Sequence, residues 1–337
     1  MVFINQTTRD RARAPEALRV LYAPVRRELD RVEELLHEEL CSEHPFVDRL
    51  VKHGFRLGGK RIRPALVLLS AKTCGRLDRE HLVLAAAVEL IHTATLIHDD
   101  VLDEATLRRH LDTVNARWDN EASILLGDYL FSRSLCMASA VDGSYACRAL
   151  SETARSMCEG ELRQVGRRGN YDLAEEDYLE IIANKTASLT ACCCRLGSHY
   201  AGADPDVCET LTRFGRQLGI AFQIADDLLD VLGDESTAGK SLGTDLLKEK
   251  PTLPLIRLLS LAGDRDRAEV EAVLARNGNH HREALLPWFE RFDAITYARE
   301  RAAWYIQRAG EELDKLPATE AREALKGLAE FVITRRQ

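Results

Sequence analysis

The 337-residue chain has few aromatic residues, prolines and glycines. Aromatic side chains make up 6% of it, and it contains 9 prolines and 20 glycines. Alternating runs of β-branched residues are also scarce, which disfavours a fold built on sheets. Leu, Ala, Glu and Arg are abundant instead, and all four suit helices. No stretch has the composition of a linker, so we expect a single all-α domain, a multi-helix bundle over residues 1–337.

The chain also lacks an excess of basic residues and a regular cysteine pattern. Its net charge is −8, which disfavours nucleic acid as a partner. The nine cysteines are an odd number with irregular spacing, which favours a reducing compartment and predicts a cytoplasmic protein. Cys192, Cys193 and Cys194 are consecutive, so on a helix they point about 100° apart and cannot close round one metal ion. We interpret them as core residues.

Neither a secretory signal nor a membrane span is expected. Residues 7–13 are polar and basic, but no apolar segment follows them. A short mitochondrial presequence is the alternative, and Asp10 argues against it. We expect residues 1–14 to form a flexible N-terminus. The most apolar segment, residues 82–98, contains Glu89 and His92, which favours a buried core helix over a membrane span.

Apolar periodicity predicts helices along most of the chain. The expected ranges are 15–40, 64–74, 80–103, 120–141, 143–166, 175–202, 204–233, 252–262, 265–276, 283–313 and 317–335. Pro64 is expected to begin its helix, at the position that Pro prefers. Residues 233–250 are rich in Gly, Ser, Thr, Asp and Lys and predict a mobile loop between two helices.

The pattern DDxxD occurs twice, each time where a long apolar helix is expected to end. The first copy holds Asp99, Asp100 and Asp103, and the second holds Asp226, Asp227 and Asp230. On a helix, carboxylates four residues apart lie on one face and repel each other, and the dipole at a helix C-terminus disfavours them further. A bound cation offsets both effects, and oxygen ligands of this kind suit Mg²⁺ shared with substrate phosphates. The alternative is that both patterns lie at solvated, fraying helix ends. The occurrence of DDxxD twice, each time at the end of an apolar helix, disfavours this alternative.

Basic residues that could bind an anionic substrate accompany these clusters. Lys60, Arg61 and Arg63 follow two glycines and precede an expected helix N-terminus, where free N–H groups attract anions. Arg108 and Arg109 follow the first acidic cluster and could fork onto phosphate oxygens. Taken alone, each group has a structural alternative: a basic surface turn, a snorkelling lysine at Lys185, or a satisfied core histidine at His92.

Seven motifs in this order resemble those of the trans-isoprenyl diphosphate synthases. They are GGKRIRP (58–64), ELIHTATLIHDDVLDEATLRR (89–109), SILLGDYLFSRS (123–134), GELRQ (160–164), NKTASL (184–189), GRQLGIAFQIADDLLD (215–230) and GKSLGTDLLKEKPTLPL (239–255). The resemblance covers roughly residues 40–260. It implies an isoprenoid synthase fold around a central cavity, a homodimer, a Mg²⁺ cofactor, and two substrates, isopentenyl diphosphate and an allylic diphosphate.

The resemblance also implies a role for individual residues. Those matching the isopentenyl diphosphate site are Lys60, Arg63, His92 and Arg109. Those matching the allylic diphosphate site are Arg108, Lys185, Thr186, Gln223, Lys240 and Lys250. Asp99, Asp103 and Asp226 match the main Mg²⁺ ligands, with Asp100, Asp227 and Asp230 as further ligands or their supports. Asp99, Asp103, Lys185, Asp226 and Lys240 are the candidate catalytic residues.

Three positions depart from the family pattern. His110 stands where Gly is usual, Asp112 where Pro is usual, and Glu249 where Gly is usual before the lysine. The departures remove no charged ligand but bear on the conformation of the loops that contain them.

The predicted reaction is extension of an allylic diphosphate by isopentenyl diphosphate, giving an all-trans chain. In the family, bulky residues four and five positions before the first aspartate stop the chain early; here these are Thr95 and Ala94, both small. From Ala94 back to Leu82 a helix rises roughly 18 Å, so we expect a medium or long product, as for a quinone side chain. The alternatives are a geranylgeranyl or farnesyl diphosphate synthase and a non-catalytic subunit of a heteromeric synthase. A class I terpene cyclase is disfavoured because it lacks an isopentenyl site.

Overall fold

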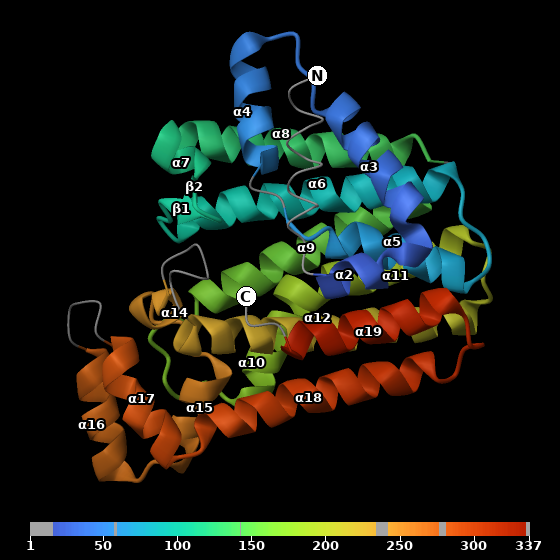
Figure 1. Cartoon of the computed structure of the whole chain (residues 1–337). Coiled ribbons are helices and arrows are strands. Elements are labelled where there is room, and N and C mark those ends of the chain that lie inside the picture. The colour runs from blue at the N-terminus through green and yellow to red at the C-terminus, as the bar shows by residue number, and fades with distance from the viewer. Residues whose placement is uncertain (1–15, 57–58, 142, 234–241, 276–280, 335–337) are drawn as a thin grey trace.

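The protein is an all-α bundle, as the composition predicts (Figure 1). This computed structural model describes residues 16–56, 59–141, 143–233, 242–275 and 281–334. Within these ranges the strands are β1 (Leu107–Arg108) and β2 (Leu111–Asp112), which pair antiparallel with Leu107 opposite Asp112.

Helices account for most of the other described residues. The N-terminal half contains α2 (Glu16–Leu21), the 3₁₀ turn η1 (Ala23–Val25), α3 (Arg26–Glu39), α4 (Pro45–Arg56), α5 (Ile62–Thr73), α6 (Arg79–Leu102), α7 (Val114–Arg117), α8 (Asn120–Ser139) and α9 (Tyr145–Val165). The C-terminal half contains α10 (Glu175–Ile182), the π-helix η2 (Ala183–Ala187), α11 (Ser188–Tyr200), α12 (Pro205–Leu232), α14 (Thr244–Leu247), α15 (Leu253–Leu261), α16 (Asp264–Leu274), α17 (His281–Arg291), α18 (Ala294–Leu313) and α19 (Glu320–Thr334).

The long helices lie side by side around one apolar core (Figure 1). The longest, α12, packs against α11 and α18, and α6 packs against α8. Cys192, Cys193 and Cys194 are buried in this core, as predicted. A smaller core, which includes Leu258, Phe289 and Val231, lies under α14–α17 at one end of the bundle. The hairpin, α14 and the C-terminal end of α6 lie at this same end, on the left of Figure 1.

Helix α6 has the length and composition of a membrane span, yet 72% of its most apolar window is buried inside the protein. Its burial supports the prediction of a core helix. The imidazole of His81, in its first turn, is fully buried and lies 3.1 Å from the carbonyl oxygen of Gly197 on α11. This contact fixes where α6 begins relative to α11.

The expected helix ranges are confirmed in outline and wrong at several breaks. The range 15–40 is interrupted by the 3₁₀ turn around Pro24, because Pro cannot donate the helical hydrogen bond. The range 283–313 is two helices, separated by Asp293 at a left-handed φ of 52°. Helix α5 begins at Ile62, two residues before Pro64. Helix α4 was not predicted: its Gly54 lies close to Ile97 and Leu126 side chains and lets α4 pack onto α6 and α8.

The predicted loop at 233–250 is also only partly described. Residues 242–250 contain the short helix α14, which was not expected. Residues 234–241, including Lys240, and the predicted flexible N-terminus at 1–14 lie outside the described part of the chain.

Candidate active site

The two aspartate clusters lie at the C-terminal ends of α6 and α12 and are joined through residues that follow the second cluster. Lys250 donates to Oδ1 of Asp103 at 2.8 Å and lies 3.7 Å from Oδ1 of Asp245. The backbone N–H of Asp245 donates to Oδ2 of Asp230 at 3.2 Å. The first cluster is thus connected to the second by one lysine and one short helix.

The three aspartates of the first cluster have different surroundings. Asp100 is buried, and Arg108 holds it with Nε at 2.9 Å and Nη2 at 2.8 Å from Oδ1. Burial raises the pKa of Asp99 to about 6, and the charges of Glu161 and Asp103 add to the rise against the attraction of Lys185. Burial also acts to raise the pKa of Asp103, but the ammonium of Lys250 outweighs it and the pKa is lowered. Asp99 is therefore the aspartate of this cluster whose pKa burial raises to about 6, with no side-chain hydrogen bond from the described residues that offsets the rise.

In the second cluster, Asp227 and Asp230 accept hydrogen bonds from distant parts of the chain. Asp227 is buried and accepts from the hydroxyl of Tyr178 at 2.6 Å and from Nε2 of Gln223 at 2.8 Å. Burial raises the pKa of Asp227 to about 7, and the charge of Asp245 adds to the rise. Asp230, also buried, accepts from Oγ1 of Thr244 at 3.2 Å as well as from the backbone of α14. Asp226 is half-buried beside them.

Lys185 lies in the π-helix η2, a feature that is frequent at functional sites. Its ammonium lies 2.5 Å from Oε2 of Glu161 and donates to Oε1 of Gln164 at 2.9 Å, both on α9. Burial would lower the pKa of Lys185, but Asp99 and Glu161 raise it above its usual value. The close approach of α9 requires Gly160, since a Cβ there would lie 2.5 Å from the backbone N of Lys185.

The basic loop at the start of α5 is held by one buried carboxylate, Glu89, and one half-buried carboxylate, Glu33. Arg61, at a left-handed φ of 56°, donates to Glu33 at 2.6 Å and to Glu89 at 2.7 Å. Burial would lower the pKa of Arg61, but Glu89 and Glu33 raise it. The sequence singled out Arg61 together with Lys60 and Arg63; its contacts show that Arg61 fixes the loop. The ammonium of Lys60 lies 5.6 Å from the centre of the Phe331 ring.

Arg109 and His92 lie in a strongly positive environment. The guanidinium of Arg109 lies against Gly59, where a Cβ would come within 2.2 Å of Nη2. Burial, followed by the charge of Arg108, lowers the pKa of Arg109 to about 10. Burial and the charges of Arg63 and Arg109 lower the pKa of His92 well below its usual value. An anion bound among these groups relieves their mutual repulsion.

Two departures from the family pattern occupy left-handed backbone positions. Arg109 and His110 form the two-residue turn of the hairpin with φ of 53° and 61°, a geometry that favours glycine. Glu249 has φ of 53°, and its carbonyl accepts from the backbone of Gly169 at 2.9 Å. Asp112 is the third departure from the family pattern. Its backbone carbonyl oxygen accepts a hydrogen bond from Nε2 of His53 at 2.7 Å. The turns keep their conformations without the usual glycines.

The sequence and fold match known proteins over nearly their whole lengths. Residues 44–286 match the polyprenyl synthetase family. The chain belongs to that family. It is 38% identical to heptaprenyl diphosphate synthase component 2 of Geobacillus stearothermophilus over 94% of this chain and 98% of that protein. It is 37% identical to octaprenyl diphosphate synthase of Escherichia coli over 88% of this chain and 93% of that protein.

A solved structure of a polyprenyl synthase from Caulobacter crescentus, complexed with calcium and isoprenyl diphosphate, superposes with a TM-score of 0.91. It is 34% identical and covers 95% of this chain and 98% of that one. The expected fold and the resemblance on which it was based are thereby confirmed.

The donor set of this polyprenyl synthetase fits divalent cations that share their ligands with phosphates. Among the described residues no group of three or more His, Cys, Asp or Glu forms a ready-made metal cage. Mg²⁺ uses one or two carboxylates and completes its shell with substrate phosphates and water. Burial raises the pKa of Asp99, and the carboxylates of Glu161 and Asp103 add to the rise, so a cation bound there would favour the ionised form.

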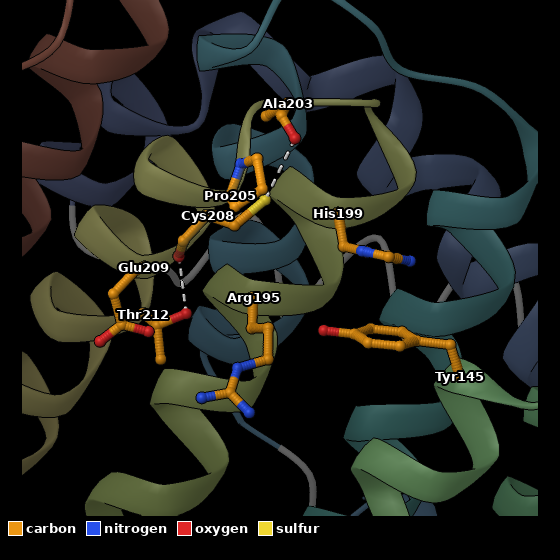
Figure 2. A pocket seen from close by; sticks show the side chains of 8 residues that line it. All are labelled: Tyr145, Arg195, His199, Ala203, Pro205, Cys208, Glu209 and Thr212. Carbon is orange, nitrogen blue, oxygen red and sulfur yellow. Dashed lines mark hydrogen bonds between the residues drawn. The ribbon is translucent and has the colours of Figure 1, made fainter.

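A cavity in the described part of the protein lies elsewhere. It has a volume of about 300 Å³ and is lined by residues that include Tyr145, Arg195, His199 and Cys208 (Figure 2). Cys208 is 18 residues before Asp226 on α12, a separation of about 27 Å along the helix. The rings of Tyr145 and His199 stack with their centres 3.7 Å apart. The polar residues of this cavity contact none of the aspartates, so we do not assign it to the active site.

Several residues around the aspartates were missed by the sequence reasoning. Glu161 and Gln164 lie in a recognised motif, but only their contacts with Lys185 show their place. Tyr178 carried no signal, because its partner is distant in sequence. Asp245 also lies in a recognised motif, but only its contacts with Asp230 and Lys250, made from a short helix that was not predicted, show its place. Gly58 and Lys240, which the motifs included, lie outside the described residues.

Proposed function

We propose that this polyprenyl synthetase condenses isopentenyl diphosphate with an allylic diphosphate to make an all-trans polyprenyl diphosphate of medium or long chain. One observation carries the proposal: on α6, half-buried His92 lies among the charges of Arg63 and Arg109, and Asp99, two turns further on, lies near other carboxylates. The first suits a diphosphate and the second a metal-bound diphosphate. Two adjacent sites of this kind are what a reaction between two diphosphates requires.

Asp99, Asp103 and Asp226 are the proposed ligands of Mg²⁺. When bound, Mg²⁺ neutralises the charge that grows on the diphosphate as its bond to the allylic carbon breaks. Lys185 lies near Asp99, and Lys250 donates to Asp103. Both ammonium groups are proposed to donate to the oxygens of the departing diphosphate. Arg108 holds Asp100 and supplies further positive charge. Thr186 and Gln223 were assigned to the same diphosphate; they hydrogen-bond each other at 2.7 Å.

Lys60, Arg63, His92 and Arg109 are the proposed ligands of isopentenyl diphosphate. Burial and the neighbouring arginines lower the pKa of His92, which favours a neutral imidazole before an anion binds. A neutral imidazole can donate one N–H to the diphosphate. The double bond of this substrate attacks the allylic carbon, and a proton then leaves the new chain. The departing diphosphate is the proposed acceptor of that proton. Lys240, outside the described residues, remains a predicted ligand of the allylic diphosphate.

A medium or long product is proposed from the small residues above the first aspartate. Ala94 is buried and Thr95 half-buried on α6, and Val88 and Ile91 continue the helix with apolar side chains. Phe131 and Leu135 on α8, the helix that packs against α6, are the candidate side chains for stopping the chain. The names of the heptaprenyl and octaprenyl synthases at 38% and 37% identity support this product class.

The deciding experiment incubates the purified chain with Mg²⁺, excess isopentenyl diphosphate and either farnesyl or geranylgeranyl diphosphate. Mass analysis is expected to show products extended by several five-carbon units. Recovery of farnesyl or geranylgeranyl diphosphate alone would support the short-chain alternative. No product from the chain alone would support a subunit role, which the word "component" in the name of one relative makes worth testing.

A homodimer of single-domain chains is also proposed. Large apolar side chains are exposed on neighbouring helices α8 and α9, among them Leu125 at 60% and Leu162 at 72% exposure. A second copy of this chain would cover both. Sedimentation analysis of the parent protein should give twice the mass of one chain. The Leu125→Glu variant should give the mass of a single chain. A monomeric parent protein would contradict the proposed homodimer. The cytoplasmic location expected from the sequence remains a prediction.

A further inference from the structure

A polar chain, buried at Tyr178, Asp227 and Thr186 and half-buried at Gln223, connects the second aspartate cluster with the π-helix that contains Lys185. Tyr178 on α10, 2% exposed, donates its hydroxyl to Oδ2 of Asp227 at 2.6 Å. Nε2 of Gln223 donates to the other oxygen, Oδ1, at 2.8 Å. Both oxygens of Asp227 are therefore bound by protein donors from two different helices.

The chain continues from Gln223 to the π-helix. Oγ1 of Thr186 donates to Oε1 of Gln223 at 2.7 Å, so both ends of the Gln223 amide are engaged. Tyr178, Asp227, Gln223 and Thr186 thus form two cross-links between α12 and the continuous segment formed by α10 and η2. A largely buried network in which each member is satisfied is rigid, because any displaced member loses its hydrogen-bond partner.

Each cross-link ends beside a charged residue of the proposed site. Asp227 directly follows Asp226, and Thr186 directly follows Lys185. A carboxylate whose two oxygens are both held fixes the backbone of the helix turn on which Asp226 lies. The cross-links therefore set the distance between an expected metal ligand and an expected diphosphate ligand.

We propose that Tyr178 is a positioning residue for the metal and diphosphate site, acting through Asp227. The proposal rests on the proposed function and assigns Asp227 the role of a support for Asp226. Residues that hold metal ligands typically contribute tenfold to a hundredfold to metal affinity. A purely structural role would instead affect stability and leave metal binding unchanged.

The variant Tyr178→Phe removes the hydroxyl and keeps the buried ring. Tyr297→Phe is the matched control, because the Tyr297 hydroxyl donates at 2.5 Å to Oε2 of Glu175, one turn before Tyr178 on α10, and not to an aspartate. Calorimetric titration of Mg²⁺ in the presence of inorganic pyrophosphate measures the site without turnover. We expect affinity to fall roughly tenfold in Tyr178→Phe and to stay unchanged in Tyr297→Phe. Thermal melting of both variants separates this effect from lost stability.

Steady-state kinetics and a second variant give independent tests. The KM for isopentenyl diphosphate should stay within about twofold in Tyr178→Phe, because Arg63 and Arg109 lie outside the network, whereas kcat should fall. In an Asp227→Asn background, Tyr178→Phe should produce no further loss of Mg²⁺ affinity, since residues acting through one another are not additive. An equal loss in both backgrounds would overturn the inference, as would an unchanged affinity in Tyr178→Phe. If the parent protein binds Mg²⁺ with pyrophosphate but forms no product, the proposed function fails while this inference stands.

Discussion

The ammonium of Lys250 donates to Oδ1 of Asp103 at 2.8 Å across 147 residues of sequence. Lys250 is 5% exposed, and Asp245 also lies within reach of its ammonium. Burial alone would lower the pKa of Lys250, but Asp245 and Asp103 raise it, so the lysine stays charged. A buried cation beside a proposed metal ligand is placed to bind the oxygens of a metal-bound diphosphate.

Lys250→Met should therefore weaken binding of the allylic diphosphate. Hydrogen bonds to charged groups contribute about 1.5–3 kcal/mol, so its KM should rise by roughly tenfold or more. The control is Lys248→Met, because Lys248 pairs at 3.3 Å with Glu104, a side chain that is 85% exposed. Exposed pairs contribute little, and steady-state kinetics should show the control unchanged. Equal KM values in the two variants would remove Lys250 from the site.

Asp99→Asn should stabilise the protein while abolishing turnover. The pKa of Asp99 is raised to about 6 from 3.8, so the folded state binds its proton more tightly than the unfolded state. Its ionisation lowers stability as the pH rises from about 4 to about 6, by roughly 3 kcal/mol in total at pH 7. Removing the charge removes this loss.

Urea unfolding at two pH values measures the effect. Asp99→Asn should unfold at higher urea concentration than the parent at pH 7, and the difference should shrink towards pH 3.5. Asp128→Asn makes the same charge change on a side chain that is 66% exposed and should show neither effect. A destabilised Asp99→Asn at pH 7 would mean that the parent carboxylate is already compensated by the protein.

Gly160→Ala should disturb the site from outside it. A Cβ at residue 160 would lie 2.5 Å from the backbone N of Lys185, so α9 and η2 must move apart. Overpacking of this kind typically costs about 1–3 kcal/mol, and the movement takes Lys185 from Glu161 and Gln164. The free energy of unfolding, measured by chemical denaturation, should fall, and kcat should fall with it. Gly310→Ala on α18, where a Cβ has no heavy atom within 4 Å, should be neutral or stabilising by up to about 1 kcal/mol.

Much of this arrangement could be predicted from the sequence, and the rest depends on contacts that the sequence does not display. Apolar periodicity located α6 and α12, and the DDxxD spacing placed their carboxylates together at the helix ends. The bond between Tyr178 and Asp227 joins residues 49 apart in sequence, and nothing local to either residue predicts it. The break at Asp293 was missed for a related reason: its left-handed turn interrupts a pattern whose apolar periodicity continues across it.

Glu249→Gly should stabilise the turn before Lys250. Glu249 holds a left-handed φ of 53°, and this conformation costs a residue with a Cβ about 1–2 kcal/mol relative to its preferred backbone. Glycine avoids that cost but loses more entropy on folding, so we expect a net gain of about 1 kcal/mol in the free energy of unfolding. Gly169→Ala is the reverse test, since Gly169 has φ of 69° and its Cβ would lie 3.2 Å from Oε2 of Glu249. The Gly169→Ala variant should have a lower free energy of unfolding than the parent protein. A higher free energy of unfolding in this variant would refute the backbone argument.

Ala94→Phe should shorten the product if the chain grows along α6 away from Asp99. Ala94 is 2% exposed and lies five residues before that aspartate, about 7.5 Å along the helix. A phenyl ring there would occupy the space that later five-carbon units need, while leaving the diphosphate ligands untouched. The initial rate of the first condensation should stay near that of the parent protein, and mass analysis should show the product distribution shifted to shorter chains. Ala94→Val, with a smaller side chain, should give an intermediate shift. An unchanged distribution from a folded Ala94→Phe variant would place the growing chain along another helix face, because a ring at residue 94 could not then be in its path.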